Sequence, residues 1–208
     1  MARGVRKRLP EGATEHVALW RQSAWRPRTG EAASEITVSP SAPPAGWAEP
    51  VDGERIAWPA VARQVSVIGS GAEWEAAAAE VGRLLAERGC TVVTGGLGEV
   101  MAAAHRGAKD AGGTTLAILP GEERRAANRW ADHVVVTGIG HARNLAVAAS
   151  GEAVIAVGGS WGTLAEMAFA KRLGRPVVAL EGAPEVPGIE RAESPARAVE
   201  RALALLGG

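Results

Sequence analysis

The sequence predicts an α/β fold of the Rossmann-like type: a doubly wound parallel sheet with helices on both faces. From residue 64 onward, short apolar runs alternate with segments that carry apolar residues at helical spacing. The apolar runs are nearly continuous, as expected of strands that are covered on both faces. Several runs end in glycine-rich turns, and ligands bind at such strand ends in doubly wound sheets.

Each predicted strand is a short apolar run that ends at a glycine, a proline or a polar residue. The strands are expected at 64–68, 91–94, 114–119, 133–137, 153–157 and 176–180. Residues 121–132 are polar and arginine-rich, and we expect a loop there. A last helix begins at Pro195 after the capping residue Ser194. The other helices are expected at 72–88, 99–111, 142–150 and 163–173.

Residues 1–60 differ from the rest of the chain. They hold seven of the twelve prolines and four of the seven tryptophans, with no sustained period of 2 or 3.6 residues. The tryptophans argue against complete disorder, because disordered segments are poor in aromatic residues. We expect a partly irregular N-terminal extension over 1–60 and a Rossmann-like nucleotide- or phosphate-binding domain over 61–208.

The composition argues against several classes of protein. The formal net charge is zero, which does not favour a general binder of nucleic acid or of membrane surfaces. No apolar run approaches the roughly 20 residues that cross a bilayer. The single cysteine, Cys90, leaves no intramolecular disulfide and fits a reducing compartment. We therefore expect a cytoplasmic protein without a membrane or nucleic-acid partner.

A glycine-rich turn joins the predicted strand at 153–157 to the next helix. Glycines in such a turn let backbone N–H groups approach a phosphate, and the helix dipole favours its negative charge. Thr163 either donates its hydroxyl to the phosphate or caps its helix, and Trp161 either stacks on a base or lies under the turn. We expect Gly159→Val to abolish ligand binding and to leave the fold mostly intact. The residues of this predicted site are Gly158, Gly159, Ser160, Gly162 and Thr163.

Two other glycine turns are candidates: the one after the second strand is expected to converge on the same ligand, and the glycines after the first strand either serve a tight turn or contact a nucleotide. The first turn resembles the start of a dinucleotide fingerprint, but Trp74 stands where G-x-G-x-x-G has its third glycine. No acid ends the second strand either, so we do not expect NAD binding. The candidate binding residues are Gly69 and Ser70 after the first strand, and Gly95, Gly96, Gly98 and Met101 after the second.

The remaining candidates lie near the starts of two predicted helices. Arg143 either offers a planar cationic fork to a phosphate or is an ordinary surface arginine at a helix start, and Asn144 follows it. Glu166 either performs proton chemistry or complements the helix dipole. His141 is either a general acid or an ordinary polar residue at a helix start. The four histidines show no spacing typical of metal ligands, so we expect no metal site.

Three motifs, in this order and spacing, resemble those of the LOG-like Rossmann superfamily. They are TGGLGEVM at 94–101, ARN at 142–144 and VGGSWGTLAE at 157–166. The superfamily includes the LOG (lonely guy) cytokinin-activating phosphoribohydrolases, the molybdenum cofactor carrier proteins and relatives formerly labelled lysine decarboxylases. The resemblance covers about residues 64–182 and implies a homodimer that requires no cofactor for its own activity.

The resemblance implies two alternative functions. In the LOG enzymes an arginine and a glutamate cleave the N-glycosidic bond of a nucleoside 5′-monophosphate, and Arg143 and Glu166 match these catalytic residues. Val157 and Asn144 stand where those enzymes have proline and lysine, and these forms are closer to the carrier-like branch. Our first hypothesis is a protein that binds a small phosphorylated nucleotide-like ligand, with the molybdenum cofactor as candidate cargo. The alternative is a phosphoribohydrolase. A DNA-binding relative is a third hypothesis, which the absence of a basic, aromatic-lined stripe in the domain disfavours.

Overall fold

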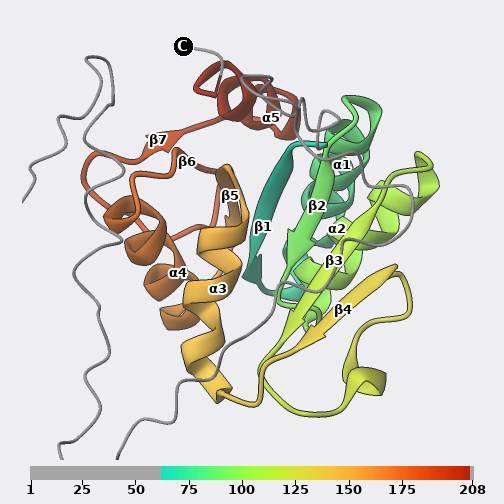
Figure 1. Ribbon diagram of the computed structural model, residues 1–208. Helices are drawn as coiled ribbons and strands as arrows, with labels where there is room; N and C mark the ends of the chain where they lie inside the picture. Colours follow the sequence, from blue (N-terminus) through green and yellow to red (C-terminus); the bar gives the residue numbers. More distant parts are fainter. Residues whose placement is uncertain (1–61, 207–208) are drawn as a thin grey trace, which may run out of the picture. The chain divides into compact units, whose positions relative to one another are not determined.

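The computed structural model describes residues 62–206, so the predicted extension at 1–60 lies outside the described part of the chain. The described residues form a parallel sheet with helices on both faces (Figure 1). The strands are β1 (Gln64–Ser70), β2 (Thr91–Thr94), β3 (Thr115–Leu119), β4 (His133–Val136), β5 (Ala153–Gly158), β6 (Val177–Ala179) and β7 (Glu190–Arg191). The α-helices are α1 (Glu75–Glu87), α2 (Glu99–Asp110), α3 (Arg143–Ser150), α4 (Trp161–Arg172) and α5 (Pro195–Ala204).

The strand order creates a switch point in the middle of the sheet. The order is β4-β3-β2-β1-β5-β6-β7, and every neighbouring pair is parallel. Strands β2, β3 and β4 therefore follow one another outward on one side of β1. The chain then returns to the other side of β1, where it forms β5, β6 and β7. Ser70 pairs with Gly158, so the carboxyl ends of β1 and β5 lie level with each other. This doubly wound α/β fold confirms the predicted fold class.

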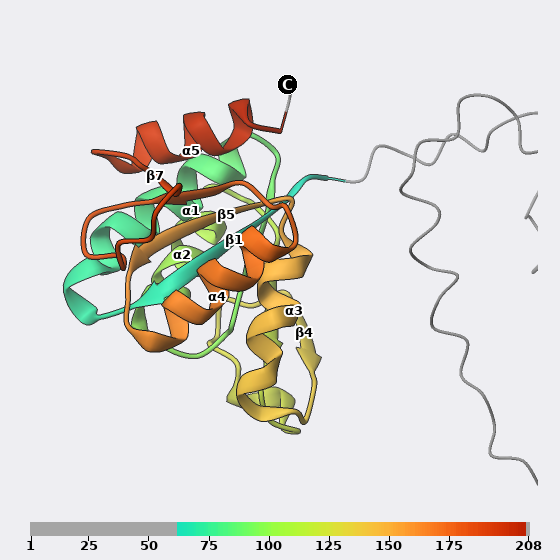
Figure 2. The same cartoon turned by 90° about the vertical axis from the view of Figure 1, so that its left-hand side faces the viewer.

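Two apolar layers explain why the strands are continuous apolar runs. Helices α1, α2 and α5 cover one face of the sheet, and α3 and α4 cover the other (Figures 1 and 2). Alternate residues of β1 enter the two layers: Val65 and Val67 pack with the first group of helices and Ile68 with the second. Because both faces are buried, polar alternation is absent from these strands.

Three differences between the observed and the predicted elements bear on the site or the sheet edge. Strand β7 was not predicted, because its two residues are charged and exposed and carry no apolar pattern. The helix expected at 72–88 begins instead with a 3-10 turn, Ala72–Trp74, before α1. Helix α4 begins at Trp161, two residues before the predicted start, so Thr163 lies in its first turn.

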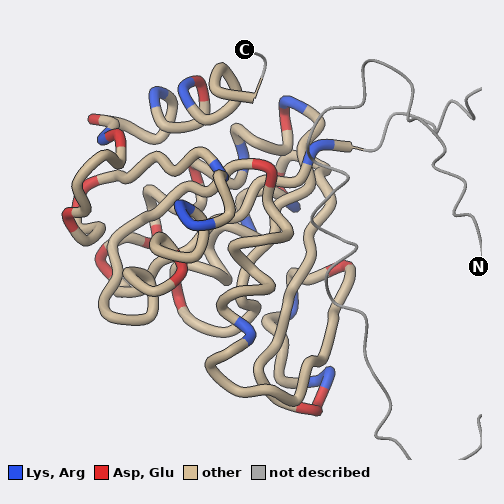
Figure 3. Tube along the Cα trace, turned by 60° about the vertical axis from the view of Figure 1, so that its left-hand side comes forward, with Lys and Arg blue, Asp and Glu red and all other residues tan. Residues whose placement is uncertain are grey.

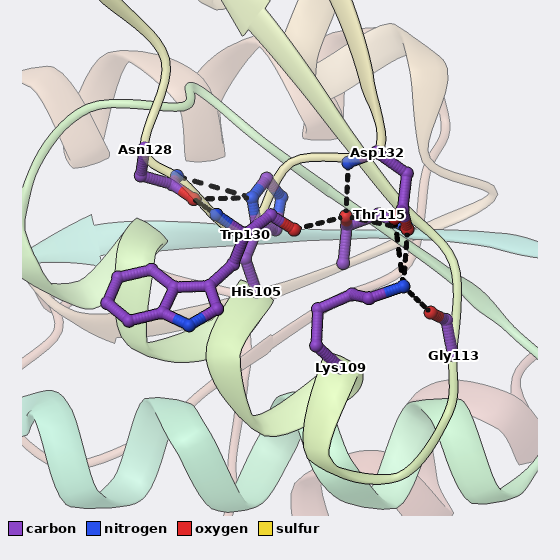
Figure 4. A network of polar contacts seen from close by, with 7 residues as sticks. All are labelled: His105, Lys109, Gly113, Thr115, Asn128, Trp130 and Asp132. Carbon is purple, nitrogen blue, oxygen red and sulfur yellow. Dashed lines mark hydrogen bonds and ion pairs between the residues drawn. The ribbon is translucent and has the colours of Figure 1, made fainter.

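A buried polar network anchors the predicted loop at 121–132 to α2 (Figure 4). His105 is fully buried and its ring nitrogens lie 3.1 Å from Thr94 Oγ1 and 3.3 Å from Asn128 Oδ1. Lys109 donates to Asp132 at 2.8 Å one turn further along the helix. Burial lowers the pKa of His105 to about 4, so the ring is neutral near pH 7 and takes part in neutral hydrogen bonds.

Candidate functional site

A cavity of about 190 Å³ lies at the carboxyl end of β1, beside the turn that follows β5. Doubly wound sheets bind their ligands at this position, where the strand order reverses. The lining residues come from β1, α2, the 3-10 turn Gly140–Ala142, the start of α3 and the first two turns of α4 with its N-cap. The lining residues are Gly69, Ser70, Met101, His141, Arg143, Asn144, Ser160, Gly162, Thr163 and Glu166. The structure therefore brings together residues that sequence analysis selected from three separate motifs.

Arg143 and Glu166 form the charged centre of this cavity. Their side chains are only 9% and 10% exposed, and Arg143 Nη1 lies 4.0 Å from Glu166 Oε1. Arg143 Nε is buried and has no hydrogen-bond partner. A buried N–H without an acceptor costs free energy, because water no longer satisfies it. The long contact to Glu166 thus leaves the guanidinium with capacity for another acceptor.

Burial sets the protonation of the pair. It raises the pKa of Glu166 to about 7, although the nearby Arg143 opposes this rise. Burial also lowers the pKa of Arg143 from its ordinary value, and Glu166 opposes that change. An arginine nevertheless stays charged at neutral pH. Near pH 7 the pair therefore carries a charge between zero and +1, which suits an anionic ligand.

The N-terminus of α4 supplies further donors. The first intrahelical hydrogen bond runs from Leu164 N to Ser160 O at 2.9 Å. The N–H groups of Trp161, Gly162 and Thr163 precede it and have no acceptor within the helix. Ser160 makes no side-chain capping bond to them. A helix start of this kind favours a phosphate or carboxylate, because its N–H groups and dipole both attract negative charge.

Gly95, Gly96, Gly98, Gly158 and Gly159 were predicted to bind the ligand but do not line this cavity. A Cβ at Gly95 would lie 1.9 Å from Arg143 Nη1, so this glycine makes room for the guanidinium. A Cβ at Gly158 would lie 2.1 Å from Trp74 Cδ1, and the residue has φ +58. These two glycines admit protein side chains at the positions where we had expected a ligand.

The other glycines of the predicted cradle also have partners within the protein. Gly96 donates its N–H to Thr94 Oγ1 at 3.0 Å, and Gly98 is the N-cap of α2. Gly159 has φ +123, and a Cβ there would lie 2.3 Å from Thr163 Oγ1. The expectation for Gly159→Val therefore changes: that substitution would strain the turn itself. Gly162 is the better position, because a Cβ there meets nothing closer than Asn144 Nδ2 at 4.0 Å.

A larger hollow of about 330 Å³ lies between β7 and α5, where Arg201 pairs with Glu190 and Arg197 with Glu200. Arg175 Nε is also buried without a hydrogen-bond partner, but Arg175 follows the C-terminus of α4 and lies outside the cavity at the switch point. Within residues 62–206, no three His, Cys, Asp or Glu side chains group as a metal site would need. No helix in the same range is long and apolar enough to span a bilayer.

The doubly wound sheet agrees with the resemblance to the LOG-like superfamily that the three sequence motifs carry. The sequence profile of the SLOG cluster4 family matches residues 62–204, and the chain belongs to this family. An uncharacterised protein of Archaeoglobus fulgidus is 41% identical over 139 residues, which are 65% of this chain and 91% of that protein.

Two solved structures are also similar. One is the molybdenum cofactor binding protein of Rippkaea orientalis, with a TM-score of 0.65 and 29% identity over 71% of this chain and 99% of the other. The second is the molybdenum cofactor carrier protein of Chlamydomonas reinhardtii, with a TM-score of 0.65 and 32% identity over 71% of this chain and 100% of the other. These likenesses confirm the predicted membership of the LOG-like superfamily.

The raised pKa of Glu166 predicts a pH-dependent effect of Glu166→Gln on stability. Between pH 4.5 and about 7 the folded protein binds more protons at this residue than the unfolded chain. The raised pKa of Glu166 therefore contributes fully to the free energy of unfolding below pH 4.5, and this contribution is lost as the pH rises through about 7. Because glutamine cannot ionise, the stability of the variant relative to the wild type should rise by roughly 1–3 kcal/mol between about pH 5 and pH 8.

Urea unfolding of both proteins at these two pH values measures the change. Glu181→Gln is the matched control, because Glu181 is exposed and lies outside the cavity. The control should show no such increase. A relative stability of Glu166→Gln that stays constant with pH would contradict the assigned burial of this carboxyl.

Proposed function

We propose that this protein binds a small phosphorylated nucleotide-like ligand, with the phosphate in the cavity between the starts of α3 and α4. The observation that carries the proposal is the buried Arg143 Nε, which has no hydrogen-bond partner. A phosphate oxygen would satisfy this donor and would bring a negative charge to the guanidinium. The free N–H groups at the start of α4 support the same ligand class.

Molybdenum cofactor is our candidate cargo. The two similar solved structures are described as a binding protein and a carrier protein of that cofactor, and both are about 30% identical to this chain. Its organic part is a phosphorylated, ring-containing molecule, which matches the proposed ligand class. Arg143, Gly162 and Thr163 would hold its phosphate, and the protein would contribute binding and orientation.

A phosphoribohydrolase is the alternative function, and the state of Glu166 favours it. A carboxyl with a pKa of about 7 is suited to proton transfer at neutral pH. Glycosidic cleavage passes through an oxocarbenium-like state, which an ionised carboxylate stabilises. Glu166 and Arg143 lie in one cavity, so both groups required for such a reaction are present. His141 lines the same cavity and is exposed.

A small-molecule ligand fits the charge distribution better than a nucleic acid does. Basic and acidic residues are interspersed over the described domain (Figure 3), and the formal net charge of the chain is zero. Nucleic-acid binding proteins concentrate Lys and Arg on one face. A cytoplasmic location stays a prediction from the single cysteine, Cys90, whose thiol is buried.

Titration with ribose 5-phosphate and adenosine 5′-monophosphate tests the proposed function. Calorimetry should show binding of both, and chromatography of the second mixture should show no free adenine if the protein is a carrier. Arg143→Gln and Gly162→Val should each weaken ribose 5-phosphate binding by about tenfold or more, because they remove a charged donor or fill the phosphate position.

Arg172→Gln is the matched control, since Arg172 is exposed at the opposite end of α4. The control should bind as the wild type does, and thermal unfolding establishes that each variant is folded. Release of adenine that stops in Glu166→Gln would favour the hydrolase. Failure of the wild type to bind either phosphate ester would overturn the proposed site.

We also propose a homodimer, in line with the superfamily resemblance. Four exposed apolar residues, which we name together the apolar patch, support it: Val135 and Val136 on the edge strand β4, and Ile139 and Leu145 near the start of α3. An uncovered edge strand with apolar side chains is an aggregation hazard that natural proteins usually protect. A second copy of the chain would cover both the strand edge and the patch.

Light scattering tests this assembly. The wild type should have twice the chain mass of 21.3 kDa, and Leu145→Glu should shift the protein toward monomer because it places a charge in the interface. Leu205→Glu is the control, since Leu205 is exposed at the end of α5, away from this patch. A monomeric wild type would contradict the proposal.

A further inference from the structure

Trp161 differs from the other tryptophans of the described part of the chain. Its side chain is 84% exposed, although it begins a well-formed helix. The indole of Trp74 packs against Gly158 and Gly182. A Cβ at either glycine would overlap atoms of this indole. Trp130 lies near two arginine guanidinium groups, at 4.9 and 5.8 Å from its ring. Trp161 thus keeps a large aromatic surface available.

The position of Trp161 places this surface at the proposed site. Its sequence neighbours Ser160 and Gly162 both line the cavity. Trp161 itself is not a lining residue, so its exposed ring lies outside the cavity, next to the N–H groups at the N-terminus of α4 that we propose to bind phosphate. A ring lying under the turn would be covered, so the exposure of Trp161 contradicts that alternative, and stacking on a base stays a prediction.

The size of the cavity indicates where the rest of the ligand lies. Pockets that enclose a whole small-molecule ligand usually have volumes of roughly 300–1,000 Å³. The volume here is about 190 Å³. A phosphate and its adjoining sugar or short linker can occupy such a space, but a fused heterocyclic ring must extend over the rim. Trp161 lies between the lining residues Ser160 and Gly162 in the chain, and its ring is uncovered outside the cavity.

We propose that Trp161 forms a ring subsite, in which its indole stacks on the planar heterocycle of the ligand whose phosphate occupies the cavity. This inference rests on the proposed function and adds the class of ligand: a phosphate ester that carries a flat fused ring, such as a purine or a pterin. Stacking needs a π-face and no particular hydrogen-bond pattern, so the subsite selects for ring shape over base identity. Arg143 and α4 supply the anchor, and Trp161 supplies the preference for ring-bearing esters.

Comparison of two phosphate esters with and without a ring tests the subsite. Adenosine 5′-monophosphate and ribose 5-phosphate are titrated calorimetrically into the wild type, Trp161→Ala and Trp161→Phe. Trp161→Ala should weaken binding of the nucleotide by about tenfold and leave ribose 5-phosphate unchanged. Trp161→Phe should restore most of the nucleotide affinity, since phenylalanine keeps an aromatic face. Phe169→Ala is the control, because Phe169 is a second exposed aromatic residue on α4 but lies eight residues further along the helix from its N-terminus.

Each other outcome overturns the ring subsite in a distinct way. Unchanged nucleotide affinity in Trp161→Ala would show that the ring lies elsewhere. An equal loss for both esters would show that Trp161 only supports the shape of the turn. A change of mass in light scattering, with nucleotide affinity retained, would assign Trp161 to a protein interface. If the wild type binds neither ester, the proposed phosphate site itself fails, and the subsite that depends on it fails too.

Discussion

The buried contact between Arg143 and Glu166 is the interaction on which the candidate site depends. It joins the first turn of α3 to the second turn of α4 across the switch point of the sheet. At 4.0 Å, with both side chains about nine-tenths buried, the contact is too long to satisfy the guanidinium fully. One of its nitrogens lacks any partner. Native proteins rarely leave such a donor unsatisfied, so an unfilled buried N–H in a cavity indicates a ligand position.

The fold creates this arrangement through the order of its strands. Because β1 and β5 end side by side, the segments that leave them must diverge to opposite halves of the sheet. The space between these segments becomes the cavity. Gly95 then leaves room for the Arg143 guanidinium, and Gly158 leaves room for the Trp74 ring. Packing of protein side chains thus explains why glycine stands at these two positions, which were predicted to contact a ligand.

Much of the fold could be predicted from the sequence, because burial on both sheet faces leaves a clear apolar signal. Strand β7 could not be predicted in this way, because Glu190 and Arg191 are exposed and leave no apolar signal. They form a strand only by pairing with β6. The superfamily motifs selected Arg143 and Glu166, and the structure places both in one cavity. Sequence could not show which glycines face that cavity, because a missing Cβ does not reveal what fills the space. Nor could it reveal the network around His105, whose partners are distant in sequence.

The side-chain N–H signal of Arg143 gives the most direct test of the central claim. In ¹⁵N NMR spectra of the wild type, assigned through Arg143→Gln, addition of ribose 5-phosphate should shift the Arg143 Nε–H resonance downfield and slow its exchange with water. This result is expected because a phosphate oxygen would become the acceptor that this buried nitrogen lacks. A bound phosphate ester that leaves the Arg143 resonance unchanged would show that the anion lies elsewhere, and the account of this site would be wrong.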